Sequence, residues 1–178
     1  MIFALYEHPD GVESESGNRI VYDVERNEAH FGAARVDRPA IVWELGGDAG
    51  GAAIAVEVEL GSETEWLARC DRVDFPPGGV AFRHVHPGPG IRRLLFGELT
   101  IDSPEGVRTY GPGGSWLEGA DFSVLATASA TEETAFVRVL LLPREWGGKR
   151  TIRYLDPRDE EKPKRQRATI FLEQPIGP

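Results

Sequence analysis

Glycine and proline recur along the whole chain and limit what it can fold into. The 178 residues include 21 Gly and 13 Pro, residue types that break helices and favour turns. Between them lie short runs that alternate polar and apolar residues or are rich in β-branched residues, a pattern typical of strands. Strands are expected in residues 19–24, 41–45, 53–60, 66–73, 80–85, 91–102, 107–110, 122–128, 136–142, 151–155 and 168–173. Because no amphipathic helical segment separates these runs, they predict an all-β antiparallel sandwich or barrel.

The length and composition indicate one compact domain spanning residues 1–178. With 40% hydrophobic residues, the chain can bury a core of its own. No apolar run reaches the roughly 18 residues of a membrane span, and the segment from Met1 to Glu7 lacks the basic region of a signal peptide. The single cysteine, Cys70, excludes an internal disulfide and a cysteine-based metal cluster. We therefore expect a cytoplasmic protein without a membrane partner, in which any metal is bound by His, Asp or Glu.

Charge is distributed unevenly. The chain has 29 acidic and 20 basic residues, a net charge of −9. Residues 1–65, which we expect to form acidic N-terminal strands, hold 14 of the acids and four of the bases. Nucleic-acid binding requires a basic surface that neutralises phosphates, so we expect no nucleic-acid partner.

The C-terminal extension, residues 144–178, contains a connector and a final strand. Residues 156–167 are of mixed charge, include proline and have no core-forming residue, which predicts an exposed linker. Residues 168–173 are too apolar to remain in water, so they should pair with a sheet edge, either of the same chain or of a second subunit. The second alternative leads us to expect a homodimer.

Two histidines are the main candidates for chemistry. His84 and His86 are separated by one residue on an expected strand. Strand side chains alternate between faces, so both imidazoles should point the same way. Two neighbouring imidazoles can share one divalent metal ion.

The residues around this pair resemble the first motif of the cupin superfamily. Pro77-Gly78-Gly79 matches the Pro-Gly turn of the motif, His84 and His86 match its histidines, and Gly97 matches its closing glycine. The segment from Tyr110 to Trp116, followed by the strand 136–142, resembles the second motif. The resemblance covers residues 66–143. It implies a cupin-like antiparallel β-barrel (jelly roll, or double-stranded β-helix) with additional N- and C-terminal strands and with ligands bound inside the barrel.

Two positions depart from the cupin pattern. Gly90 stands where similar proteins have a metal-binding Glu, and Val124 or Leu125 stands where they have a last His. Glu118, on the strand that leads into the second-motif loop, is the nearest candidate for a third donor, with Asp121 as a weaker one. With the two histidines, Glu118 would form a two-His, one-carboxylate set that suits Fe(II); Mn, Ni and Zn are the other metals expected.

Arginine and aromatic residues are candidates for ligand binding. Alternation counted from Gly90 places Arg92 and Phe96 on the inward side. Arg92 would bind a carboxylate, enolate or phosphate, or would pair with Glu118 or Asp121. Arg138 has the same two interpretations. Trp116 and Phe96 would line the pocket mouth.

Two functions remain open. In the first, a small pocket around His84 and His86 binds a divalent metal, a small organic anion or both, and the cupin resemblance implies dioxygenase, isomerase or decarboxylase chemistry. In the alternative, the histidines are hydrogen-bonded residues of a degenerate metal site, and the protein is a non-catalytic module that binds or senses a small molecule. The sequence contains no Gly-x-Gly-x-x-Gly fingerprint, so we expect no nucleotide cofactor. It assigns no catalytic residue.

Overall fold

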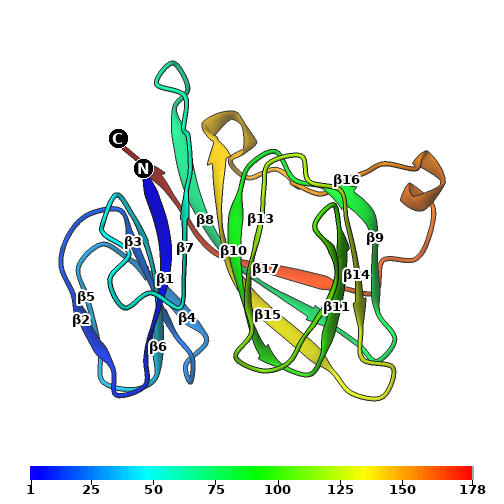
Figure 1. The fold of residues 1–178 in the computed structure, drawn as a ribbon, viewed down its shortest axis with the longest axis horizontal. Coiled ribbons are helices and arrows are strands. Elements are labelled where there is room, and N and C mark those ends of the chain that lie inside the picture. The colour runs from blue at the N-terminus through cyan, green and yellow to red at the C-terminus, as the bar shows by residue number, and fades with distance from the viewer. Residues whose placement is uncertain (178) are drawn as a thin grey trace.

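The computed structural model describes residues 1–177 and consists mainly of antiparallel strands, which confirms the all-β prediction. These residues form three five-stranded sheets and one two-stranded ribbon. Figure 1 shows the N-terminal strands on the left and the other two large sheets on the right. No helix in residues 1–177 is long and apolar enough to cross a bilayer.

The N-terminal sheet has the strand order β4-β3-β6-β1-β7. Its strands are β1 (Ile2–His8), β3 (Arg19–Asp23), β4 (Glu28–Phe31), β6 (Ala40–Leu45) and β7 (Ile54–Glu57). The ribbon pairs β2 (Val12–Ser14) with β5 (Ala34–Val36). Val36 of the ribbon packs on Val21 and Val42 of the N-terminal sheet, so the ribbon covers one face of that sheet.

The remaining two sheets face each other. The central sheet has the order β13-β10-β15-β8-β17 and contains β8 (Trp66–Phe75), β10 (Gly90–Phe96), β13 (Ser115–Glu118), β15 (Thr134–Pro143) and β17 (Arg167–Ile176). The distal sheet has the order β12-β11-β14-β9-β16 and contains β9 (Val80–Val85), β11 (Leu99–Ser103), β12 (Gly106–Tyr110), β14 (Val124–Ala128) and β16 (Arg153–Tyr154). The short 3₁₀ turns η1 (Arg144–Trp146) and η2 (Pro157–Glu160) lie in the C-terminal extension. Within residues 1–177 the two sheets form a jelly-roll-like sandwich that is not closed by hydrogen bonds into one continuous barrel.

The central sheet is buried on both faces, and this decides where the site lies. Val137, Val139 and Leu141 of β15 belong to the core shared with the N-terminal sheet. Phe136 belongs instead to the core shared with the distal sheet. Because strand side chains alternate, the even-numbered residues of β15, Arg138 among them, face the space between the central and distal sheets.

Several strand predictions need correction. The run 91–102 forms two strands, β10 and β11. The resemblance already implied a new strand after its closing glycine, and Gly97, with φ of +78°, turns the chain there. The strand β1 is absent from the sequence-based strands, since its successive residues Phe3, Ala4 and Leu5 are all buried and leave no alternation to detect. The short strands β2, β4 and β5 were likewise not predicted.

The final strand pairs within its own chain. β17 runs antiparallel to β8 along the edge of the central sheet, which decides between the two alternatives for residues 168–173. The linker 156–167 includes η2 and is mostly exposed, although Asp159 is buried. Because residues 168–173 already pair with β8 of their own chain, they do not require a second subunit.

Candidate functional site

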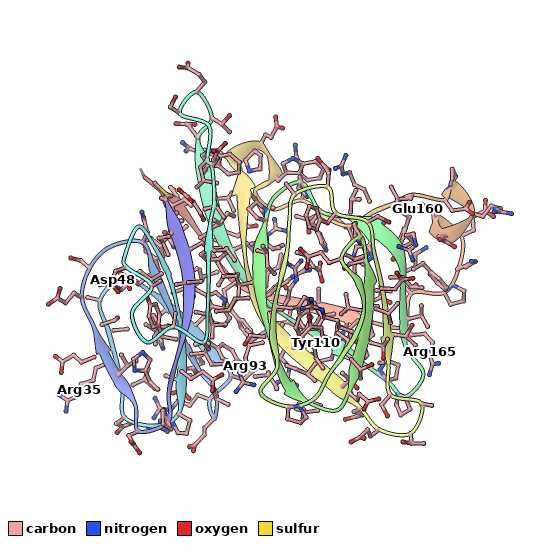
Figure 2. All side chains as sticks on the ribbon, in the orientation of Figure 1. Arg35, Asp48, Arg93, Tyr110, Glu160 and Arg165 are labelled. Carbon is pink, nitrogen blue, oxygen red and sulfur yellow. The ribbon has the colours of Figure 1, made fainter. Side chains whose placement is uncertain are left out.

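A cavity of about 610 Å³ lies between the central and distal sheets. Arg69 of the central sheet lines it and is paired with Glu173. Five further polar side chains from both sheets line one part of it: Asp71, His84, His86, Glu118 and Arg138. We call these five residues the polar floor. The C-terminal extension contributes a further part of the lining, and Figure 2 labels Glu160 and Arg165 on the side where this extension runs.

The two histidines lie side by side on the polar floor. His84 is the penultimate residue of β9 and His86 follows that strand. Their side chains are buried, with 5% and 4% of their surface exposed. The ring centroids are 5.1 Å apart and the rings are almost perpendicular. Both rings line the cavity.

Hydrogen bonds define which nitrogen of each ring carries a lone pair. His84 Nδ1 lies 2.7 Å from the carbonyl oxygen of Phe82, which can only accept, so Nδ1 donates and Nε2 is free. His86 Nε2 lies 3.0 Å from Arg138 Nη1, which can only donate, so Nε2 accepts. The proton of His86 is then on Nδ1, 3.2 Å from Thr151 Oγ1.

Both histidines are held in the neutral form. Burial lowers the pKa of His84. Burial, reinforced by the Arg138 guanidinium, lowers the pKa of His86 well below its ordinary value. A neutral imidazole is the form that binds a metal ion.

Glu118 lies directly across from Gly90 in the register of β13 and β10. A Cβ at Gly90 would lie 2.5 Å from Leu140 Cδ2 and 2.8 Å from the carbonyl oxygen of Val139, so this position has no room for a side chain. The carboxylate that is missing at Gly90 is thus found on the neighbouring strand, at the paired position. Val124, which stands where similar proteins have a last metal-binding His, pairs with His84 and is buried in the apolar core.

Two side chains hold the Glu118 carboxylate. Trp116 Nε1 donates to Glu118 Oε1 over 2.9 Å, and Arg92 Nη2 lies 2.7 Å from Glu118 Oε2. Arg92 is fully buried and does not line the cavity; burial lowers its pKa to about 10, so it is charged at neutral pH. Arg92 was expected either to bind an anionic ligand or to pair with Glu118 or Asp121, and in the structure it forms the ion pair with Glu118. Asp121 pairs instead with Arg153 on the surface.

Of the two arginines expected to bind a ligand, Arg92 and Arg138, only Arg138 lines the cavity. Its Nε and Nη2 donate to the two oxygens of Asp71 over 2.7 and 3.2 Å, while Nη1 donates to His86. Asp71 and Thr151 were missed by the sequence analysis. Alternation along the expected strand 66–73 places Asp71 on the same face as Arg69 and Val73, but nothing in the sequence indicates that this face meets Arg138.

The aromatic candidates lie away from the cavity lining. Trp116 is buried, stacks on Tyr110 with centroids 4.7 Å apart, and contacts Glu118 from behind. Phe96 is 39% exposed and lies under the Arg72 guanidinium. Its expected inward orientation is wrong because the pairing of β10 with β15 shifts register between Leu94 and Phe96, which interrupts the alternation.

His84, His86 and Glu118 form a potential metal-binding cluster. One donor atom from each lies within 4.8 Å of the others, and all three residues are buried. Two imidazoles and a carboxylate are donors suited to Fe, Mn, Ni or Zn. The residues therefore fit a divalent transition metal, with one condition: Arg138 must release the lone pair of His86 Nε2.

No protein-family model matches the sequence, and no curated protein matches it. Solved structures similar to part of the chain include an RmlC-like cupin from Shewanella frigidimarina, which is 14% identical over 51% of this chain and 94% of its own, with a TM-score of 0.40. A polyketide cyclase from Streptomyces resistomycificus is 15% identical over 49% of this chain and 61% of its own, with a TM-score of 0.41. A sugar phosphate isomerase of a cupin superfamily from Silicibacter pomeroyi is 20% identical over 40% of this chain and 48% of its own, with a TM-score of 0.36. This chain thus spans less than two thirds of the cyclase and of the isomerase.

Proposed function

We propose that the cavity binds a divalent transition metal through His84, His86 and Glu118 and holds a small organic anion beside it. The observation that carries this proposal is the meeting of three buried donors within 4.8 Å of one another. Two of the three are neutral imidazoles, and the third is a carboxylate, a combination that binds metals of this class. The cupin resemblance of residues 66–143 makes dioxygenase, isomerase and decarboxylase activities the ones to assay.

The surrounding residues orient these donors. The carbonyl oxygen of Phe82 keeps the His84 proton on Nδ1 and leaves Nε2 free in a ring that lines the cavity. Trp116 and Arg92 hold the Glu118 carboxylate from the side away from the cavity. Such neighbours of metal ligands set their orientation and basicity. When bound, the metal would act as a Lewis acid toward a carbonyl or enolate oxygen or would activate dioxygen.

A second candidate is a non-catalytic module that binds a small molecule without metal. The contact of Arg138 Nη1 with His86 Nε2 at 3.0 Å favours this second candidate. The guanidinium occupies the one lone pair of His86 that could bind a metal ion, and its positive charge repels a cation. In this version Arg138 would contribute a hydrogen bond to a ligand carboxylate.

Metal content distinguishes the two candidates. Untagged protein would be loaded anaerobically with Fe(II), Mn(II), Ni(II) or Zn(II), desalted, and analysed by mass spectrometry of the elements. We expect about one metal ion per chain, lost in the double variant His84→Ala/His86→Ala. The matched control is His8→Ala/His30→Ala, which removes two histidines that do not line the cavity. Folded wild type that retains no metal would overturn the metal site and favour the second candidate.

Assembly and compartment complete the proposal. β17 is an edge strand of the central sheet, and a second copy pairing along it would give the homodimer that we expect. Sedimentation velocity of the full chain tests this, since a monomer at micromolar concentration would contradict it.

A reducing, cytoplasmic setting is consistent with Cys70, a buried cysteine without a disulfide.

A further inference from the structure

From the lining of the cavity we infer that its ligand is an amphipathic organic anion, with its charged group between Lys149, Arg150 and Lys164 and its apolar part between the two sheets. The inference deepens the proposed function, because it concerns the same cavity, but it does not require the metal. The charged group would be a carboxylate or a phosphate monoester, since both accept hydrogen bonds from lysine and arginine.

The C-terminal extension brings an excess of positive charge to the cavity. Lys149, Arg150 and Lys164 line it, and Glu160 is the one acidic residue that the extension, as far as residue 177, adds to the lining. We call these four residues the cationic rim. Arg150 Nη1 lies 3.2 Å from Glu160 Oε2, and Lys164 Nζ lies 4.0 Å from the same oxygen. Within residues 1–177, Lys149 has no ion-pair partner.

The rim therefore carries three cations for one carboxylate in a chain whose net charge is −9. A positive region on an acidic protein attracts anions locally, whereas the rest of the surface repels them.

Two of the three cations of the rim, Arg150 and Lys164, are positioned before any ligand binds. The Arg150 guanidinium lies 5.2 Å from the centre of the Tyr154 ring, and Lys164 Nζ lies 4.9 Å from it. Lys164 also donates to the carbonyl oxygens of Asp159, over 2.6 Å, and Glu160. An ammonium group has three donors, so one N–H of Lys164 remains for a ligand. Positioning of this kind lowers the entropy cost of binding.

The polar floor offers no comparable excess of charge. Arg138 is paired with Asp71, and Glu118 is paired with Arg92 behind it. In the metal-free protein, the charge of an anionic ligand is therefore best placed at the rim.

The size and walls of the cavity indicate the remainder of the ligand. The two sheets also contribute apolar side chains to the lining, among them Val73 and Phe136, which lie beyond Asp71 and Arg138 along β8 and β15: Val73, Phe75, Ala81, Ile101, Ala126 and Phe136. A volume of about 610 Å³ is in the range that accepts drug-sized ligands. A small anion such as acetate would leave this apolar surface in contact with water, whereas an apolar body would cover it.

Isothermal titration calorimetry in EDTA tests the inference, with decanoate and decyl phosphate as probes below their micelle concentrations. We expect at least one of the two to bind, and their relative affinity tells a carboxylate site from a phosphate site. Acetate and inorganic phosphate test the need for an apolar body, and 1-decanol tests the need for charge. Equal binding of 1-decanol, or binding of acetate or phosphate as tight as that of the decyl probes, would overturn the inference.

Charge variants locate the binding site. Lys149→Gln combined with Lys164→Gln should weaken binding of the preferred probe about tenfold. Arg165→Gln is the control, because Arg165 is a cation next to Lys164 in the linker 156–167 but does not line the cavity. Equal affinity in the lysine double variant and the wild type would contradict the assignment. All titrations contain EDTA, so probe binding is measured independently of the metal. If the protein binds the probe but retains no metal in the loading experiment, only the metal site is overturned. If it retains metal but does not bind the probe, only this inference is overturned.

Discussion

Arg138 donates to His86 Nε2, the lone pair that a metal ion would need. Asp71 holds the guanidinium in this position through two hydrogen bonds. At the scale of single residues, the balance between metal binding and metal-free ligand binding therefore depends on how readily one arginine moves. Removing only Arg138 would leave the Asp71 carboxylate buried and unpaired, which is costly, so both partners must be changed together.

The double variant Arg138→Gln/Asp71→Asn should bind Zn(II) more tightly than the wild type. It removes the cation that competes for His86 and leaves two neutral polar side chains in place of the ion pair. We expect the dissociation constant to fall about tenfold, equivalent to about 1.4 kcal/mol, in competition with a chelating dye. Arg153→Gln/Asp121→Asn, which removes an exposed ion pair outside the cavity, should leave the constant unchanged. An unchanged or weaker affinity in the buried double variant would show that Arg138 does not compete with the metal.

Burial of the two histidines should make the metal-free protein less stable in mild acid. In the unfolded chain each ring takes up a proton as the pH falls through about 6.5, whereas the lowered pKa of His84 and His86 keeps both folded rings neutral. The unfolded state then binds more protons, so the free energy of unfolding is greatest above pH 6.5. It should decrease as the pH falls toward 5.5, by up to about 1.4 kcal/mol per pH unit for each ring.

Urea unfolding in EDTA between pH 7.5 and 5.5 measures this slope. His86→Gln should show a shallower dependence, since one of the two rings is gone. If the variant and the wild type lose stability equally over this interval, the acid sensitivity comes from other groups.

At the scale of strands, the register of neighbouring elements places the site. Glu118 of β13 faces Gly90 of β10, and Val124 of β14 pairs with His84 of β9. The turn between β10 and β11 contributes to this register because it ends β10 at Phe96. Gly97 in this turn has φ of +78°, and a Cβ there would lie 2.4 Å from the carbonyl oxygen of Glu133.

Gly97→Ala should therefore lower the free energy of unfolding by about 2–3 kcal/mol, through the unfavourable φ and the collision with backbone. Gly111→Ala is the control, since that glycine has no positive φ and nothing lies within 4 Å of its added Cβ. Its effect should stay within about 0.5 kcal/mol. Urea midpoints at constant m-value measure both, and equal midpoints for the two variants would contradict the importance of this turn.

At the scale of the whole molecule, the N-terminal sheet and the central sheet share one core. Phe3, Leu5 and Trp43 pack with Val139 and other residues of the central sheet. Trp43 Nε1 also donates to the carbonyl oxygen of Ile91 over 3.1 Å. Without the N-terminal strands, the outer face of the central sheet would be exposed as a large apolar surface.

The shared core predicts that the full chain unfolds as one unit, in keeping with the expected single domain. Differential scanning calorimetry should show one transition with equal calorimetric and van't Hoff enthalpies. Leu5→Ala, in the N-terminal sheet, should shift this whole transition, with a loss of about 2–5 kcal/mol. A second transition in the variant, with the other remaining at the wild-type temperature, would show two independent domains instead.

The sequence alone predicted those features that depend on neighbours along the chain. Turn-forming glycines and prolines separate the strands, and alternation along one strand placed His84 and His86 on a common face. It also predicted that residues 168–173 pair with a sheet edge. Where alternation fails locally, the prediction fails too, as with Phe96 after the register shift in β10 and with β1, whose successive residues are buried.

Only the tertiary structure decided which faces meet. It pairs Arg138 with Asp71 and His86, and Arg92 with Glu118, and it brings the basic residues of the C-terminal extension to a cavity between two sheets. These contacts join residues far apart in the sequence, and they depend on strand register and on how sheets pack. Periodicity along one strand carries information about that strand's faces, whereas register between strands is set by turns and by the packing of side chains from the whole molecule.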